Sequence, residues 1–366
     1  MSRISRPSPD PGDAAPRPLL VCADERLLDE LLRLCAAAGV EPQVAHDAGS
    51  ALPTWSSAPV VLVGAELADD VATAGLPRRP EVALVSQDLD DGSVWRRAVA
   101  VGASEVVLLP DGADWVVDVL ADAALPGRGG AVVCVVGGRG GAGASTLSAA
   151  VALAAMRAGL RAVLVDGDPL GGGLDLVLGS EDVPGVRWPD LAGARGRVPP
   201  ADLTAALPEV DALHVLSWDR GDQLEVGAEA MESVLRAAVH TADLVVVDLP
   251  RRPDESARVA LRHARATFLV VPAEVRAVSA ACRVVSLVRP LTASLRVVVR
   301  GPAPSGLDPG TVAEALQLTL AGHCRAEPGL AQALERGLPP GSRRGPLAAL
   351  ASRLVEDVVG GARRAQ

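Results

Sequence analysis

The residues best suited to chemistry form a glycine-rich segment, VVGGRGGAGAST, at positions 135–146. It follows an apolar run at 131–136 and precedes a helical pattern that begins at Ser145. A loop between a strand and a helix directs backbone N–H groups, and the positive end of the helix dipole, at whatever anion lies there. Ser145 and Thr146 add hydroxyl groups at the helix start. The segment therefore predicts a phosphate-binding loop.

Two kinds of nucleotide site have loops of this type. As a P-loop, residues 138–145 fit G-x-x-x-x-G-K-S, except that Ala144 stands in the lysine position. As a dinucleotide-binding loop, residues 138–143 form a complete G-x-G-x-x-G, and Asp166 ends the next apolar run. On the glycines alone, the dinucleotide loop of an NAD(P)-binding oxidoreductase is the better match.

The residues around the loop favour the P-loop interpretation. A hydroxyl pair directly after the last glycine suits Mg²⁺ ligation, with Ser145 as the ligand. The run ADLVVVDLP puts Asp248 at the end of an aliphatic strand, where a carboxylate holds magnesium through water. The segment VDGDP adds Asp166 and Asp168 after another predicted strand. These three features in this order outweigh the dinucleotide fingerprint and favour a P-loop that holds Mg²⁺.

Residues 131–358 resemble the MinD/ParA family of deviant-Walker P-loop ATPases. The family loop, K-G-G-x-G-K-[ST]-T, aligns without a gap with RGGAGAST at 139–146, and the D-x-D switch segment aligns with DGD at 166–168. The resemblance implies ATP and Mg²⁺ as cofactors and an ATP-sandwiched homodimer. It assigns the phosphates to Gly138, Arg139, Gly140, Gly141, Ala142, Gly143, Ala144, Ser145 and Thr146, the metal to Ser145 and Asp248, and catalytic switch and water-positioning roles to Asp166 and Asp168.

Three departures from the family pattern bear on activity. Arg139 replaces the first loop lysine and keeps a charge that can bind phosphate through two N–H groups. Ala144 replaces the second lysine, which removes a charge-assisted hydrogen bond worth about 1.5–3 kcal/mol, or about ten- to a hundredfold in affinity. Arg300 stands where the family often has an asparagine that reads adenine. We expect ATP binding through backbone donors and Mg²⁺, with hydrolysis slow or absent.

The part of the chain before this loop, residues 17–125, alternates strand-like and helix-like patterns and predicts a second parallel sheet. It resembles a response-regulator receiver domain, although a flavodoxin-like domain without receiver ancestry is the alternative. Gly64 cannot accept a phosphoryl group and Leu109 cannot pair with one, so we expect a pseudo-receiver that serves as a docking surface. The receiver's acidic pair, phosphoacceptor, hydroxyl and lysine map to Ala23 and Asp24 (with Glu25 following), Gly64, Ser86 and Leu109.

These patterns together predict an α/β protein with two doubly wound parallel-sheet domains. The first is CheY/flavodoxin-like, and the second is a P-loop NTPase domain of MinD-like type. We expect a disordered leader over 1–16, the receiver-like domain over 17–125, a linker over 126–130 and the P-loop domain over 131–366.

Composition narrows the function classes. All basic residues are arginines, and the net charge of −10 disfavours non-specific nucleic-acid binding. The N-terminal residues lack an apolar signal segment and no run approaches ~18 apolar residues, so we expect a cytoplasmic protein.

The five cysteines show no metal spacing and are expected to be buried. An apolar stripe in 346–366 lacks Trp and Phe and carries acids on its polar face, which favours packing on the core over membrane association; its members are Leu347, Leu350, Leu354, Val355 and Val358.

A receiver-like domain before such an ATPase narrows the resemblance to CpaE/TadZ-like proteins, and among these to the actinobacterial septum-site-determining, or Ssd-like, branch. The resemblance implies a positioning or scaffold protein for septum-site placement, or for Flp/Tad-type pilus and secretion assembly. Its implied partners are proteins of those machineries, with recruitment to the septum or a cell pole. A slow ATPase that drives localisation and an NAD(P)-binding oxidoreductase are the alternatives.

Overall fold

The computed structural model describes residues 17–79, 81–88, 91–123, 130–193, 198–304, 306–341 and 344–364. The chain divides into two compact units, 1–127 and 128–366. The predicted leader (1–16) and most of the predicted linker (126–130) lie outside the described residues.

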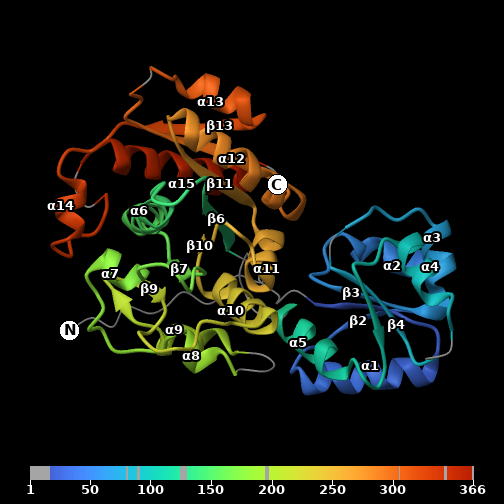
Figure 1. Cartoon of the computed structure of the whole chain (residues 1–366). Helices are drawn as coiled ribbons and strands as arrows, with labels where there is room; N and C mark the ends of the chain where they lie inside the picture. The colour runs from blue at the N-terminus through green and yellow to red at the C-terminus, as the bar shows by residue number, and fades with distance from the viewer. Residues whose placement is uncertain are drawn as a thin grey trace, which may run out of the picture. The chain divides into compact units, whose positions relative to one another are not determined.

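The first unit is a five-stranded parallel sheet in the order β2-β1-β3-β4-β5, the order of flavodoxin-like folds. One face packs against α1 and α5, and the other against α2, α3 and α4 (Figure 1). The predicted α/β fold is confirmed, whereas β2, α2 and α3 have no counterpart in the sequence patterns. The elements are β1 (Leu19–Val21), α1 (Glu25–Ala37), β2 (Gln43–Ala45), α2 (Ala48–Trp55), β3 (Val61–Gly64), the 3₁₀ turn η1 (Ala65–Leu67), α3 (Ala68–Thr73), β4 (Val82–Ser86), α4 (Val94–Val101), β5 (Glu105–Leu108) and α5 (Ala113–Ala123).

The second unit is an eight-stranded sheet in the order β13-β12-β11-β6-β10-β7-β9-β8. All its strand pairs are parallel except β8 with β9. Five of these strands were predicted from apolar runs in the sequence, whereas β8, β9 and β13 were not predicted. The strands are β6 (Ala131–Gly137), β7 (Ala162–Asp166), β8 (Glu209–Val210), β9 (Leu213–Leu216), β10 (Leu244–Leu249), β11 (Ala266–Pro272), β12 (Leu295–Arg300) and β13 (Thr319–Cys324).

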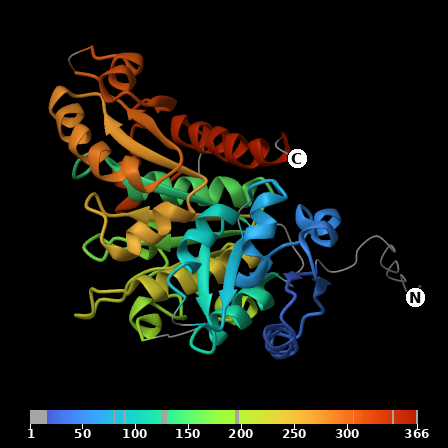
Figure 2. The ribbon, with the colours of Figure 1, turned by 90° about the vertical axis from the view of Figure 1, so that its right-hand side faces the viewer.

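Helices cover both faces of this sheet (Figures 1 and 2). On one face lie α6 (Ala144–Arg157), α7 (Leu174–Leu178) and α15 (Pro346–Arg364). On the other lie α8 (Trp188–Leu191), α9 (Pro200–Ala206), α10 (Ala228–Thr241), α11 (Glu255–His263), α12 (Val275–Val288) and α13 (Pro309–Leu316). A 3₁₀ turn, η2 (Arg289–Leu291), follows α12, and the short helix α14 (Leu330–Leu334) follows β13.

Helix α6 lies deep in the second unit, because nine successive residues, 147–155, are buried. Most of them are small, so α15 can pack closely along it (Figure 2). The predicted apolar stripe of α15 faces this contact and is buried at all five positions, 347, 350, 354, 355 and 358. The expectation that this stripe packs on the core is confirmed.

The cysteine expectation holds for four residues and is wrong for one. Cys282 lies on the exposed side of α12, because the helix buries Ala281, Val284 and Val285 instead. Within the described residues, no helix combines the length and the apolar character needed to cross a bilayer.

Candidate nucleotide site

The glycine-rich loop joins β6 to α6 and is shaped by its glycines. Gly141 and Gly143 have φ values of +66° and +94°, which glycine adopts without strain. A side chain at Gly138 would meet β11 and α12, because its Cβ would lie 2.9 Å from Val271 Cγ2 and 3.0 Å from Ala281 Cβ. Gly143 is the N-cap residue of α6, and no side chain among the described residues caps that helix end. The first N–H groups of α6 are therefore available to an anion.

The predicted metal residues, Ser145 and Asp248, come together beside this loop. Strand β10 pairs with β6, and Asp248 is the register partner of Val135. The Asp248 carboxylate accepts a hydrogen bond from the Ser148 hydroxyl at 3.0 Å, and the Ser145 hydroxyl lies close enough to lower the pKa of Asp248. Burial raises the pKa of Asp248 to about 6, although the two serine hydroxyls act in the opposite direction.

This pair suits magnesium. A hydroxyl and a carboxylate are the hard oxygen ligands that Mg²⁺ accepts, directly or through water. Because burial disfavours the charged carboxylate, a cation beside Asp248 would relieve that penalty. When bound, Mg²⁺ would offset the negative charge of phosphate oxygens held on the loop.

Asp166 has structural partners. It is buried at the end of β7, and its Oδ2 accepts hydrogen bonds from the Leu174 backbone N–H at 2.9 Å and the Ser217 hydroxyl at 3.0 Å. Its backbone carbonyl accepts from the indole N–H groups of Trp188 and Trp218. Burial, followed by the charge of Asp248, raises the pKa of Asp166 to about 7. Asp166 thus ties the segment after β7 to the sheet.

Asp168 is the more available of the two predicted catalytic acids. It is partly exposed, and its Oδ1 accepts a hydrogen bond from the Leu170 backbone N–H at 3.1 Å. Farther along the same segment, the buried Asp175 bonds to Ser217 and forms an ion pair with Arg220 at 3.1 Å. Sequence reasoning missed the hydroxyl partners Ser148 and Ser217, whose only signal is a polar residue inside an apolar run.

Arg139, the first cation of the loop, is paired with the start of α12. Its guanidinium forms an ion pair at 2.9 Å with Glu274, the N-cap residue of α12. Both side chains are more than one-third exposed, so the pair contributes at most about 1 kcal/mol and can open for a ligand.

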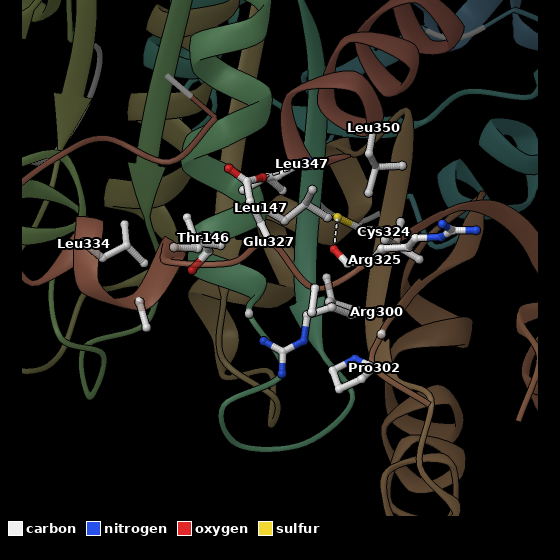
Figure 3. Close-up of a pocket in the computed structure, with 17 residues that line it drawn as sticks. Thr146, Leu147, Arg300, Pro302, Cys324, Arg325, Glu327, Leu334, Leu347 and Leu350 are labelled. Carbon is white, nitrogen blue, oxygen red and sulfur yellow. Dashed lines mark hydrogen bonds between the residues drawn. The ribbon is translucent and has the colours of Figure 1, made fainter. Parts of the chain in front are cut away.

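A cavity of about 290 Å³ adjoins the loop (Figure 3). Its walls combine the start of α6, including Thr146 and Leu147, with the ends of β12 and β13 and with leucines of α14 and α15. Arg300, at the end of β12, is one of its lining residues, as are Pro302 and Cys324. A half-open, mainly aliphatic cavity beside a phosphate loop suits a flat ring such as a nucleobase.

The strand order separates the two interpretations of the loop. In a dinucleotide-binding fold, the strand after the loop's helix pairs directly with the first strand. Here β10 lies between β6 and β7, so Asp248, and not Asp166, is next to the loop's strand. This arrangement argues for the P-loop and against the oxidoreductase alternative.

In the first unit, the predicted phosphoacceptor edge is filled by a side chain that sequence reasoning missed. Glu66 follows β3 and its carboxylate lies against Gly64. Its Oε1 accepts hydrogen bonds from the backbone N–H groups of Ala23 at 2.9 Å and Asp24 at 3.3 Å. The Asp24 carboxylate caps α1, and Leu109 is buried.

Comparison with known proteins agrees with this two-part architecture. Residues 21–131 match the family model described as Rv3660c-like, CheY-like N-terminal domain. The protein Rv3660c of Mycobacterium tuberculosis strain H37Rv is 40% identical over 340 residues, which cover 91% of this chain and 95% of that relative. The chain belongs to the Rv3660c-like family. Its first domain is CheY-like.

The second domain of this Rv3660c-like protein has a MinD-like P-loop fold. The septum site-determining protein MinD of Thermotoga maritima is 26% identical over 159 residues, covering 43% of this chain and 58% of that protein. The MinC:MinD cell division complex of Aquifex aeolicus matches with a TM-score of 0.53 and 24% identity, over 63% of this chain and 96% of that one. Pyrococcus horikoshii MinD, solved with Mg-ADP, matches with a TM-score of 0.53 and 20% identity, over 62% and 95%.

Proposed function

We propose that this Rv3660c-like protein is a nucleotide-binding positioning or scaffold protein. Its second domain holds ATP or ADP with Mg²⁺ on residues 138–146 and hydrolyses ATP slowly or not at all. The observation that carries the proposal is the uncapped N-terminus of α6, which opens beside the Ser145 and Asp248 pair. The P. horikoshii MinD structure contains Mg-ADP, which supports the same ligand class here.

Each residue of the proposed nucleotide site would have a role that follows from its position. Backbone N–H groups of Gly138 to Gly143, with Thr146, would hold the phosphates, and Ser145 and Asp248 would hold the magnesium. Asp168 would position water, whereas Asp166 keeps the switch segment in place. With Ala144 in the lysine position, the developing charge on the transferred phosphoryl group lacks a stabilising cation from the loop, so turnover is slow.

The scaffold role would be exercised through protein contacts. The MinC:MinD complex shows that a protein of this fold assembles with a partner, and we infer partners from division or from pilus and secretion machinery. The receiver-like domain would supply a docking surface, and nucleotide would support a homodimer. Imaging a fluorescent fusion at septum or pole distinguishes the two destinations.

Titration calorimetry with ATP·Mg²⁺, ADP·Mg²⁺ and NADH tests the binding proposal. The natural chain should bind the adenine nucleotides in a magnesium-dependent way, and Asp248→Asn should weaken the magnesium dependence. Asp243→Asn, which changes a half-exposed carboxylate paired with Arg161 just before β10, is the matched control. Binding of NADH alone would overturn the proposal. Release of phosphate from ATP at about 1 s⁻¹ or faster would contradict the scaffold role and favour the alternative of an ATPase that drives localisation.

A further inference from the structure

The phosphate site lacks a lysine in its loop, but a cation reaches the loop from a neighbouring strand. Arg300 is the last residue of β12, and its side chain runs along the wall of the cavity (Figure 3). A Cβ built on Gly143 would lie 3.3 Å from a terminal guanidinium nitrogen of Arg300 and 3.7 Å from its Cδ. The guanidinium therefore packs against the N-cap residue of α6, where the uncapped N–H groups begin.

Arg300 forms no ion pair within the described part of the chain. Its Nε is buried without a hydrogen-bond partner there. The cavity's own carboxylate, Glu327, accepts a hydrogen bond from the backbone N–H of Leu347 at the start of α15. A buried donor without a partner is costly, so an anion at this position would be favoured.

The other arginines near the loop are placed differently. Arg139 is paired with Glu274. Arg251 approaches the middle of the loop, where its guanidinium lies 4.0 Å from the Cβ position of Gly140, and its side chain is exposed. Arg139 and Arg300 are both partly buried, and both have a buried Nε without a hydrogen-bond partner among the described residues. Arg300 differs in that it packs against the start of α6 and forms no ion pair within the described part of the chain.

We propose that Arg300 is the phosphate-binding cation of this site and replaces, from strand β12, the lysine that the loop lacks at Ala144. This inference rests on the proposed nucleotide-binding function. The planar guanidinium can give two parallel N–H donors to two oxygens of one phosphate, which a lysine cannot. The ligand class is a diphosphate or triphosphate whose charge lies between Arg300 and the N–H groups of α6.

Inorganic pyrophosphate separates this role from base recognition, because it carries the phosphates without a base. Calorimetry with magnesium pyrophosphate and with ADP·Mg²⁺ would compare the natural chain with Arg300→Met, which keeps the length of the side chain and removes its charge. We expect Arg300→Met to bind both ligands about ten- to a hundredfold more weakly. Arg300→Lys should retain part of the affinity, and adding Ala144→Lys to Arg300→Met should restore it.

Two further variants serve as controls. Arg283→Met removes an exposed arginine of α12 and should change neither affinity. Thermal unfolding of the ligand-free variants tests whether they fold. If Arg300→Met does not fold, Arg300→Gln, which retains a polar side chain, takes its place in the same titrations.

The outcomes distinguish this inference from the function on which it rests. If the natural chain binds neither ligand, the proposed function fails, and the inference with it. If the natural chain binds both and Arg300→Met binds pyrophosphate equally well, Arg300 is not the cation, while the nucleotide site stands. A loss for ADP alone would make Arg300 a base-reading residue. Loss of pyrophosphate binding in Arg251→Met, with Arg300→Met unaffected, would make Arg251 the phosphate-binding cation.

Discussion

At the residue scale, two acids that look equivalent in the sequence have different surroundings. Asp166 and Asp248 both end aliphatic strands, and their Cα atoms are register partners across β7 and β10. Asp248 bonds to hydroxyl groups of α6, which begins at the phosphate loop. Asp166 bonds to Ser217, a residue 51 positions away, and to the backbone of its own switch segment. Strand patterns place such acids at the sheet edge but do not reveal which partners they meet.

Ala144 leaves the loop itself without a cation, so a lysine there should strengthen nucleotide binding most where Arg300 cannot supply one. In the Arg300→Met background, Ala144→Lys is expected to raise the affinity for ATP·Mg²⁺ by about ten- to a hundredfold, since an ammonium group at the α6 N-terminus gains a charge-assisted bond to phosphate. The gain in the natural chain should be smaller, because Arg300 already carries that charge. Calorimetry measures the change. Ala158→Lys, which adds the same charge at the exposed far end of α6, should have no such effect. Equal gains in both variants would mean a general charge effect.

Glu232 on α10 should make stability depend on pH. Burial raises its pKa, but His263 and Arg236 outweigh that effect and hold the pKa at about 2, below the ordinary 4.5. The stabilisation is therefore present above about pH 4.5 and is lost as the pH falls towards 2. Because the group is partly solvated, we expect Glu232→Gln to lower the free energy of unfolding by about 1–2 kcal/mol at pH 6.

Urea denaturation at pH 6 and pH 3 measures this effect. The free energies of unfolding of the natural chain and of Glu232→Gln should differ less at pH 3 than at pH 6. Glu255→Gln, which breaks an exposed pair with Arg258 on α11, should cost almost nothing at either pH. A constant difference across the pH range would show that Glu232 acts through packing and not through its charge.

At the element scale, the helix pair α6 and α15 supports one side of the candidate site. α6 carries the loop at its N-terminus and is buried along most of its length, and α15 covers it with an apolar stripe. An ion pair between Arg296 and Asp357 also joins β12 to α15. The stripe could be read from the sequence because its spacing is that of a helix face. The partner of the stripe could not, since nearly 200 residues separate the two helices.

Leu354 should be a stabilising residue of this helix pair. It is 1% exposed within the core cluster that includes α6. Leu354→Ala is expected to lower the free energy of unfolding by about 2–4 kcal/mol, because it leaves a cavity between packed helices. Ser352→Ala, on the exposed face of the same helix, should change it by less than about 0.5 kcal/mol. Chemical denaturation compares the two, and similar small losses would mean that α15 is not part of the cooperative core.

Strand prediction failed where the pattern was short or polar. β2 has three residues, and β13, TLAGHC, includes a glycine and a histidine and has half of its residues exposed. Neither shows the apolar run that marks the central strands. Failing to predict these two strands did not affect the predicted site. The loop, Ser145 and Asp248 are carried by β6, α6 and β10 at the centre of the sheet.

At the scale of the whole molecule, each unit has its own hydrophobic core clusters on both faces of its own sheet. The domain boundary predicted from composition, at 126–130, falls at the division between the units after Gly127. What the sequence could not supply were long-range contacts such as the one between Glu66 and Ala23, 43 positions apart.

The second unit should therefore fold and bind nucleotide without the first. A fragment of residues 128–366 is expected to unfold cooperatively and to bind ADP·Mg²⁺ within about threefold of the full chain, because its sheet, both helix layers and all the candidate site residues lie within it. Circular dichroism and calorimetry would test this. A fragment that is unfolded in isolation would show that the first unit supplies part of the core.

The Glu66 carboxylate has a consequence for signalling. The Glu66 side chain already occupies the sheet edge where a receiver domain is phosphorylated. Its two hydrogen bonds from backbone N–H groups hold it there. We expect acetyl phosphate to leave the mass of the protein unchanged. The domain would then respond to the binding of another molecule and not to phosphorylation.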